Sequence, residues 1–229
     1  MDMQKQEIEI PKEVPVMTIG GMVLFPQAVM PLHIFEPRYQ EMLGEVLASD
    51  RIFAVAALDE SNPENKAKEK PYLTAGIGVV RACRTNEDGT SNLVIQGLAR
   101  VQLETITREE PFRKARIVPI QSEPGGPTEA VAAIRGSVLN LVQALIQLGA
   151  SIPREVPEFL RKIKDPETVL DLSIYSLCPP SLLKQELLET TEILLRYQRF
   201  ETFMHSEVER LRLENKLKGE LDDDSIGLN

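Results

Sequence analysis

Two pairs of side chains have types and spacing that could support nucleophilic catalysis. Ser181 and Lys184 lie three residues apart, so a lysine could activate a serine. Because Ser181 follows a proline and can cap a helix, while Lys184 suits a solvated face, we favour structural roles for both. Cys178 and His205 could form a thiol–imidazole pair, but no third residue that would orient the histidine is evident. A buried thiol is the preferred interpretation.

Metal and cofactor sites are not expected. His33 lies inside an apolar segment and is one of only two histidines. Cys83 and Cys178 are far apart and belong to no Cys-x-x-Cys motif, whereas a structural zinc site needs several such ligands at close spacing. Two isolated cysteines in 229 residues indicate free thiols in a reducing, cytoplasmic compartment.

Charge disfavours nucleic acid as a partner. The net charge is −9, and both halves of the sequence are acidic. One local basic group remains, formed by Arg108, Arg113, Lys114 and Arg116. Solvated strand faces explain it best, and an acidic peptide or RNA site is the alternative. The N-terminus has no apolar signal region, and no window approaches ~18 uninterrupted apolar residues, so no membrane association is expected.

The first half of the chain must supply most of the framework as strands. Short apolar or alternating runs predict strands at residues 14–19, 22–25, 29–35, 52–58, 74–84, 93–98, 100–106 and 112–120. Pro37 suits the first turn of a helix that ends near Asp50 and carries an apolar stripe at helical spacing, which begins with Tyr39 and Met42. Residues 59–71 are polar enough for an exposed loop. So many strands with one helix predict a small closed or nearly closed barrel.

The second half changes to a helical period. Residues 121–127, QSEPGGP, form the clearest boundary. Helices are predicted from about Val131 to Gly149, from Asp165-Pro166 onward, and from about 191 to 218. We therefore expect a barrel domain at 1–121, a helical bundle at 122–218 and an acidic mobile tail at 219–229.

A series of short motifs resembles one protein family. They are VLFP at 23–26, PL at 31–32, GIGVV at 76–80, DG at 88–89, VIQGLAR at 94–100, IPREV at 152–156, DP at 165–166 and KQELLE at 184–189. In this order they resemble the substrate-binding domain at the N-terminus of Lon proteases, over roughly residues 14–215. IFEPRY at 34–39 is typical of the stand-alone bacterial branch. The resemblance implies an α+β fold: a PUA-like, mainly-β pseudo-barrel with one inserted helix, then a C-terminal helical bundle with a long last helix.

The resemblance also implies a function without catalysis. The sequence has no G-x-x-x-x-G-K-[ST] phosphate loop and no match to the Ser-Lys protease domain of Lon. The expected function is therefore that of a protein- or peptide-binding module for unfolded or specific clients, extended to an adaptor that serves a protease or chaperone. The alternatives are an ATP-independent peptidase-like enzyme and a PUA-like RNA-binding protein. Client identity and oligomeric state stay open.

Five residues are the candidate peptide-binding set: Met22, Phe25, Met30, Phe35 and Arg38. Methionine and phenylalanine side chains adapt to varied apolar partners, which suits a groove that accepts unfolded segments. We expect that groove at the junction of barrel and bundle. The alternative is that the methionines and phenylalanines fill the barrel core.

Overall fold

The computed structural model describes residues 9–61, 63–179 and 182–226, with residues 219–226 as backbone only. The chain divides into two compact units, one of residues 1–121 and 175–189, the other of residues 122–174 and 190–229. The expected boundary after residue 121 coincides with one of these limits, whereas residues 175–189 belong to the first unit. The division into three consecutive domains stays a prediction.

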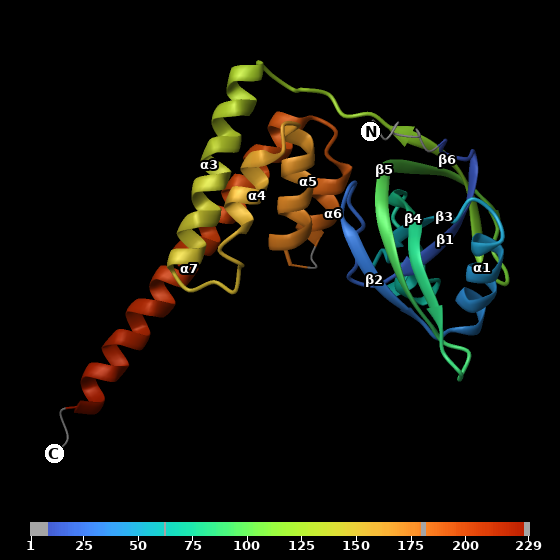
Figure 1. Ribbon diagram of the computed structural model, residues 1–229, viewed down its shortest axis with the longest axis horizontal. Helices are drawn as coiled ribbons and strands as arrows, with labels where there is room; N and C mark the ends of the chain where they lie inside the picture. Colours follow the sequence, from blue (N-terminus) through green and yellow to red (C-terminus); the bar gives the residue numbers. More distant parts are fainter. Residues whose placement is uncertain (1–8, 62, 180–181, 227–229) are drawn as a thin grey trace, which may run out of the picture. The chain divides into compact units, whose positions relative to one another are not determined.

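Six strands are described in the first unit. They are β1 (Glu13–Ile19), β2 (Val29–Ile34), β3 (Ile52–Ala57), β4 (Thr74–Thr85), β5 (Ser91–Arg108) and β6 (Arg113–Ile120). The sheet order is β2-β5-β4-β3-β1-β6, and an additional β5–β6 pairing closes five of the strands on themselves (Figure 1). With helix α1 (Pro37–Leu47) between β2 and β3, this confirms the expected pseudo-barrel with an inserted helix.

The barrel is closed at one end and has a seam at the other. The long strand β5 pairs with β2 through its first half and with β6 through its second half. Strand β1 pairs with β6 only from Glu13 to Val16, so the residues from Met17 to Ile19 pair with β3 alone. The last residues of β1 and the free edge of β2 then line one common pocket, which marks the seam.

The segment before β2 crosses the sheet instead of pairing with it, so the strand expected at 22–25 is wrong. A Cβ on Gly76 would lie 2.0 Å from the carbonyl oxygen of Leu24, and one on Gly97 would lie 2.0 Å from that of Phe25. The Gln27 N–H also donates to the Gly97 carbonyl at 2.9 Å. Backbone contact this close is possible only because both strand positions are glycine.

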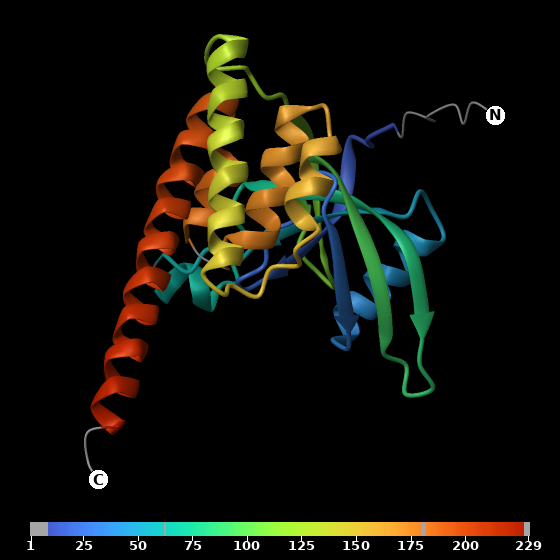
Figure 2. The same ribbon diagram turned by 60° about the vertical axis from the view of Figure 1, so that its left-hand side comes forward.

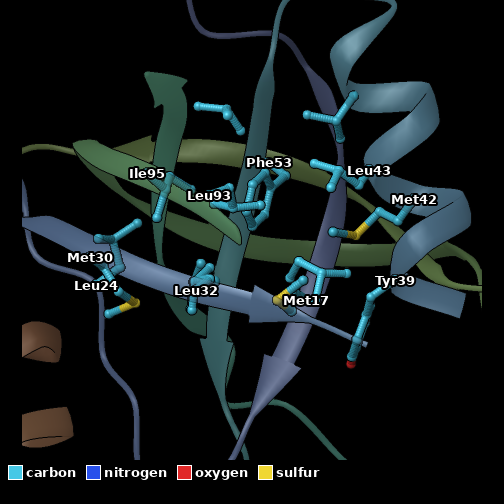
Figure 3. Packing of buried hydrophobic residues seen from close by; sticks show 14 of the residues in the cluster. Met17, Leu24, Met30, Leu32, Tyr39, Met42, Leu43, Phe53, Leu93 and Ile95 are labelled. Atoms are coloured by element: carbon cyan, nitrogen blue, oxygen red, sulfur yellow. The ribbon is translucent and has the colours of Figure 1, made fainter. Parts of the chain in front are cut away.

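The barrel core follows from these elements (Figure 3). Alternation along β2 turns Met30, Leu32 and Ile34 inward and leaves the residues between them exposed. Helix α1 buries a stripe at helical spacing that includes Tyr39 and Met42. All of these residues belong to one buried cluster with residues of β3 and β5.

The second unit is helical. It contains α3 (Thr128–Gln147), α4 (Val156–Lys162), most of α5 (Pro166–Leu177) and the long α7 (Ile193–Ile226), while α6 (Leu182–Glu189) belongs to the first unit. Helices α3 and α7 lie side by side, and α7 continues past α3 (Figure 2). Arg196 of α7 is fully buried and forms ion pairs of 2.9 Å with both Asp171 and Glu167 of α5.

Three other elements differ from the expectation. A short helix, α2 (Pro63–Ala67), interrupts the expected loop at 59–71, and β5 is one strand where two were expected. Register shifts in its pairing let β5 change partners without a break. Helix α7 continues through Ile226, so the acidic residues expected to form a tail are helical up to that point. Mobility of the tail stays a prediction.

Helix α3 is long and apolar enough to cross a membrane by length and composition. Its apolar run is not continuous, since polar residues such as Arg135 and Asn140 interrupt it. Val138, Val142 and Leu145 of α3 are buried, and the helix packs on α7 and α4. A single helix of this kind is weak evidence for a membrane span, because core helices of globular units pass the same test; here a third of the apolar window is buried.

Candidate functional site

The seam of the barrel holds an open pocket of about 400 Å³, which we call the seam pocket. Its walls come from the end of β1 and the loop after it, from β2 and the turn into α1, and from the segment that carries α2. The lining residues are Met17–Gly20, Met22, Pro31–Glu36, Arg38, Tyr39, Leu58 and Glu69. Most of these side chains are apolar, so the pocket suits apolar groups of a partner.

A second pocket of about 400 Å³ adjoins the first. It shares Thr18, Arg38 and Tyr39 with the seam pocket and is completed by Val16 and the segment from Glu109 to Arg113. This second pocket, which we call the β6 pocket, has more charged groups. The two together form one surface in which an apolar half meets a charged half.

Tyr39 belongs to the barrel core and also lines the seam pocket. Its hydroxyl donates to the Thr18 carbonyl at 3.0 Å and accepts the Thr18 N–H at 3.2 Å. Burial raises the pKa of Tyr39, so the phenol keeps the proton that it donates. Because one side chain satisfies both backbone groups of Thr18, β1 offers neither of them to a further strand.

Arg38 organises the charged rim. Its guanidinium forms ion pairs with Glu36 at 2.8 Å and with Glu69 at 2.5 Å, and it lies 4.7 Å from the centre of the Tyr39 ring. Arg113 donates to the Glu69 carbonyl at 2.7 Å and to Thr18 Oγ1 at 3.2 Å. The two arginines thus hold the segment after α2 against the seam.

Acid should weaken the link between Arg38 and Glu69. The hydrogen bond from Arg38 lowers the pKa of Glu69, so its contribution to stability is present above the unfolded pKa of about 4.3 and is lost as the pH falls further. Both side chains are about a third to a half exposed, at 34% and 47%, so the loss is at most about 1 kcal/mol.

We expect Glu69→Gln to speed amide hydrogen exchange in residues 63–70 at pH 7.

A matched control for this prediction is Glu64→Gln. Glu64 also pairs with a cation, Lys68 at 2.7 Å, but both side chains are mostly exposed and neither residue lines the seam pocket or the β6 pocket. The Glu64→Gln variant should leave amide hydrogen exchange in residues 63–70 nearly unchanged. Equal acceleration by both variants would show that the Arg38–Glu69 pair does not restrain this segment.

The five candidate residues separate into two groups. Met22, Phe35 and Arg38 line the seam pocket, and Met22 and Phe35 are 36% and 62% exposed. Phe25 and Met30 are 0% and 2% exposed and belong to the core, which was the alternative for all of the apolar candidates. A surface role for these two is therefore withdrawn. Peptide binding by the other three stays a prediction, as does a groove at the junction of barrel and bundle.

The described residues that were considered for catalysis make structural contacts and do not form a catalytic pair. Ser181 lies outside the described residues. The Lys184 ammonium donates to the carbonyls of Tyr175 at 2.7 Å and Cys178 at 3.0 Å, so it caps the C-terminal end of α5, and burial lowers its pKa. Cys178 is buried, and His205 belongs to the other compact unit. Within the described ranges, no group of His, Cys, Asp and Glu could hold a metal ion.

The local basic group is largely neutralised. Glu45 of α1 pairs with both Arg108, at 3.4 Å, and Lys114, and Glu109 pairs with Arg113 at 2.8 Å. Three of its four cations are therefore paired with carboxylates, and the exposed Arg116 alone is not the extended positive surface that phosphate backbones require. His33 is likewise engaged, with its Nδ1 2.9 Å from Asn92 Oδ1.

Sequence reasoning missed Tyr39 and Glu69 as parts of this site, and it placed Arg113 only in the local basic group. Tyr39 was assigned only to the apolar stripe of its helix, and its hydroxyl gives no sequence signal of a partner 21 residues away. Glu69 lies in a segment that looked like a solvated loop, and its partner Arg38 is 31 residues distant. A tyrosine at a buried helical position is the one available hint, since a buried hydroxyl needs a hydrogen-bond partner.

Comparisons with known proteins agree on one family. The family model described as "ATP-dependent protease La (LON) substrate-binding domain" matches residues 13–206. Among curated relatives, the Lon protease of Desulfosudis oleivorans is 23% identical over 94% of this chain and 26% of its own length. Lon protease 2 of Myxococcus xanthus is 25% identical over 93% of this chain and 26% of its own length. The chain thus spans about a quarter of the length of these relatives.

Solved structures show the same fold. The N-terminal domain of a Mycobacterium avium complex Lon protease superposes with a TM-score of 0.67 at 17% identity, over 86% of this chain and 98% of that one. A Lon N-terminal domain protein from Xanthomonas campestris gives a TM-score of 0.55 at 14% identity, over 82% and 96% of the two chains. These likenesses confirm the expected fold.

Proposed function

The chain belongs to the family of ATP-dependent protease La (LON) substrate-binding domains, and from that premise we propose that it binds apolar segments of unfolded or partly folded proteins in the seam pocket, without catalysing a reaction. The observation that carries this proposal is the exposure of Phe35, 62%, and Met22, 36%, beside an open pocket. Large apolar side chains gathered at a concave surface are typical of sites that bind another molecule.

The chemistry of the surrounding residues supports binding over catalysis. Lys184 is committed to two backbone carbonyls, and the described part of the chain offers no metal-binding group. Pairing of three of the four basic side chains with carboxylates disfavours RNA binding. We therefore propose a recognition module that presents clients to a protease or chaperone. Cys83 and Cys178 form no disulfide, which supports a reducing, cytoplasmic compartment for it.

Binding of a labelled, permanently unfolded protein tests the proposal. We expect saturable binding by fluorescence anisotropy without nucleotide, with modest affinity because ordering a disordered client is costly. The variant Phe35→Ser should weaken binding by about tenfold, since full burial of a phenylalanine contributes about 1.5–3 kcal/mol.

The matched control is Phe159→Ser. Phe159 is 57% exposed, close to the value for Phe35, but it lies on α4 in the second unit and lines neither of the two pockets. We expect this variant to bind like the parent protein. Equal losses in both variants would indicate general surface stickiness, and an absence of binding at high micromolar concentration would refute the proposed function.

A further inference from the structure

We infer that the seam pocket holds its client by strand addition: an extended, apolar segment carrying lysine or arginine pairs its backbone with the free edge of β2. This inference rests on the proposed function and adds the binding mode and the chemistry of the segment. Strand addition requires backbone groups of β2 that are free to pair, a neighbouring strand that does not occupy them, and a pocket rim whose charge selects the segment.

The phase of the β2–β5 ladder shows which backbone groups are free. The Gly97 N–H donates to the Ala28 carbonyl at 2.9 Å, and the register pairs Val29 with Gln96. In an antiparallel ladder, alternate residues bond to a given neighbour, so Met30, Leu32 and Ile34 bond to β5. The backbone groups of Pro31 and His33 then point away from β5, toward the seam pocket that both residues line.

These groups have no partner within the described residues. None of the hydrogen bonds there uses the carbonyl of Pro31 or the N–H or carbonyl of His33. The Val29 carbonyl, one step earlier on the same edge, accepts the Tyr175 hydroxyl at 3.2 Å. The free stretch therefore begins at Pro31 and offers alternating acceptors and donors, as a strand edge does.

Proline occupies the position where it harms the sheet least. Pro31 has no N–H, and at this position the N–H would point to the free side, so the ladder with β5 is intact. Proline in a sheet is found at such edges and not in central strands. An added strand would therefore bond to the carbonyl of Pro31 and to both backbone groups of His33.

The facing strand leaves this edge open. The Tyr39 hydroxyl holds both backbone groups of Thr18, so the end of β1 cannot pair across the seam with β2. An inserted segment then pairs on one side only. Alternate side chains of the segment would point toward the apolar lining of the pocket, which includes Met17, Met22 and Phe35.

The rim selects against acidic segments. The two pockets are lined by four carboxylates, those of Glu36, Glu69, Glu109 and Glu110, and by the guanidinium groups of Arg38 and Arg113. Both arginines already form ion pairs with members of this carboxylate set. The remaining excess of negative charge favours lysine or arginine at the flanks of the bound segment.

Backbone methylation of a probe peptide tests strand addition directly. The probe is a labelled peptide of about nine residues in which valine and threonine alternate between lysine ends. Only alternate amides of an added strand face β2, so N-methylation at one parity should weaken binding at least about tenfold, and at the other parity less than about twofold. A twin peptide with glutamate ends should bind at least about fivefold more weakly in low salt.

A matched pair of protein variants makes the same test from the other side. His33→Pro removes the free N–H of His33 without touching the β5 ladder, while His33→Ala removes the imidazole together with its contact with Asn92 and its stacking on Phe35. We expect the proline variant to bind the probe about tenfold more weakly than the alanine variant. Unchanged thermal unfolding checks that both fold, and the methylated peptides provide the test if the proline variant does not.

The outcomes separate this inference from the proposed function. If the unfolded protein binds through Phe35 but methylation shows no dependence on parity, the function holds and strand addition is wrong. If the probe does not bind although the unfolded protein does, the inference is overturned as well. If neither binds, both proposals fall. Equal affinity for the lysine and glutamate peptides would refute the charge selection.

Discussion

The variant Gly97→Ala is expected to destabilise the barrel by about 3 kcal/mol or more, because the added methyl meets backbone that cannot move aside. Its Cβ would lie 2.0 Å from the Phe25 carbonyl oxygen and 3.3 Å from Pro26 Cα. Relief requires lifting this segment off β5, and that breaks the bonds of Gly97 with Gln27 and Ala28, both 2.9 Å. Urea unfolding, followed by circular dichroism, measures the loss.

Gly44→Ala is the matched control for this substitution. Gly44 lies in α1, and a Cβ there would have no atom within 4 Å. Replacing an unhindered helical glycine by alanine should stabilise the protein by roughly 0.5–1 kcal/mol. The same change in chemistry should therefore have opposite signs at the two positions. A neutral Gly97→Ala would show that the crossing segment is not packed on β5 as described.

The variant Asp171→Ala is expected to destabilise the second unit by about 3–5 kcal/mol, because it leaves a buried guanidinium without its buried counter-ion. Arg196 is 0% exposed and Asp171 is 1% exposed, and their atoms are 2.9 Å apart. Glu167 would still pair with Arg196, but its side chain is 27% exposed and compensates less. Faster amide exchange in α3 and α5 should accompany the loss.

Two further variants define the origin of this effect. Glu158→Ala removes an ion pair with Lys162 that is 2.9 Å long but exposed, and it should leave unfolding nearly unchanged. The double variant Asp171→Leu with Arg196→Met should recover much of the stability lost in Asp171→Ala, since buried pairs can often be replaced by apolar residues. A double variant as unstable as Asp171→Ala would indicate that packing of the side chains, and not the unpaired charge, limits stability.

The sequence was sufficient for elements whose signal is local. Alternation in β2, the helical spacing of Tyr39 and Met42, and the punctuation at residues 121–127 each depend on neighbours a few positions apart. The strand expected at 22–25 failed because its apolar residues pack on Gly76 and Gly97, which are more than 50 residues away in the chain. Propensity cannot report a contact with distant backbone.

The site was predicted only in part for the same reason. Phe25 and Phe35 look alike in sequence, yet one contacts β5 and the other faces solvent. The distinction depends on how residues 20–28 cross the sheet, which no local pattern records. The seam itself arises because β5 changes partners from β2 to β6, a property of a strand 18 residues long that local patterns had divided into two.

Pro31 also bears on the solubility of the protein. Under the proposed function the open edge of β2 would meet unfolded chains that aggregate readily, and identical strand edges can also join to form polymers of one protein. If two copies paired through their β2 edges, neither Pro31 could donate a backbone hydrogen bond. The ladder between the two copies would therefore lose two hydrogen bonds. A client segment without proline would lose only one hydrogen bond, the one that the N–H at position 31 would have donated. The absent N–H of Pro31 therefore disfavours pairing between two copies more than it disfavours binding of a client.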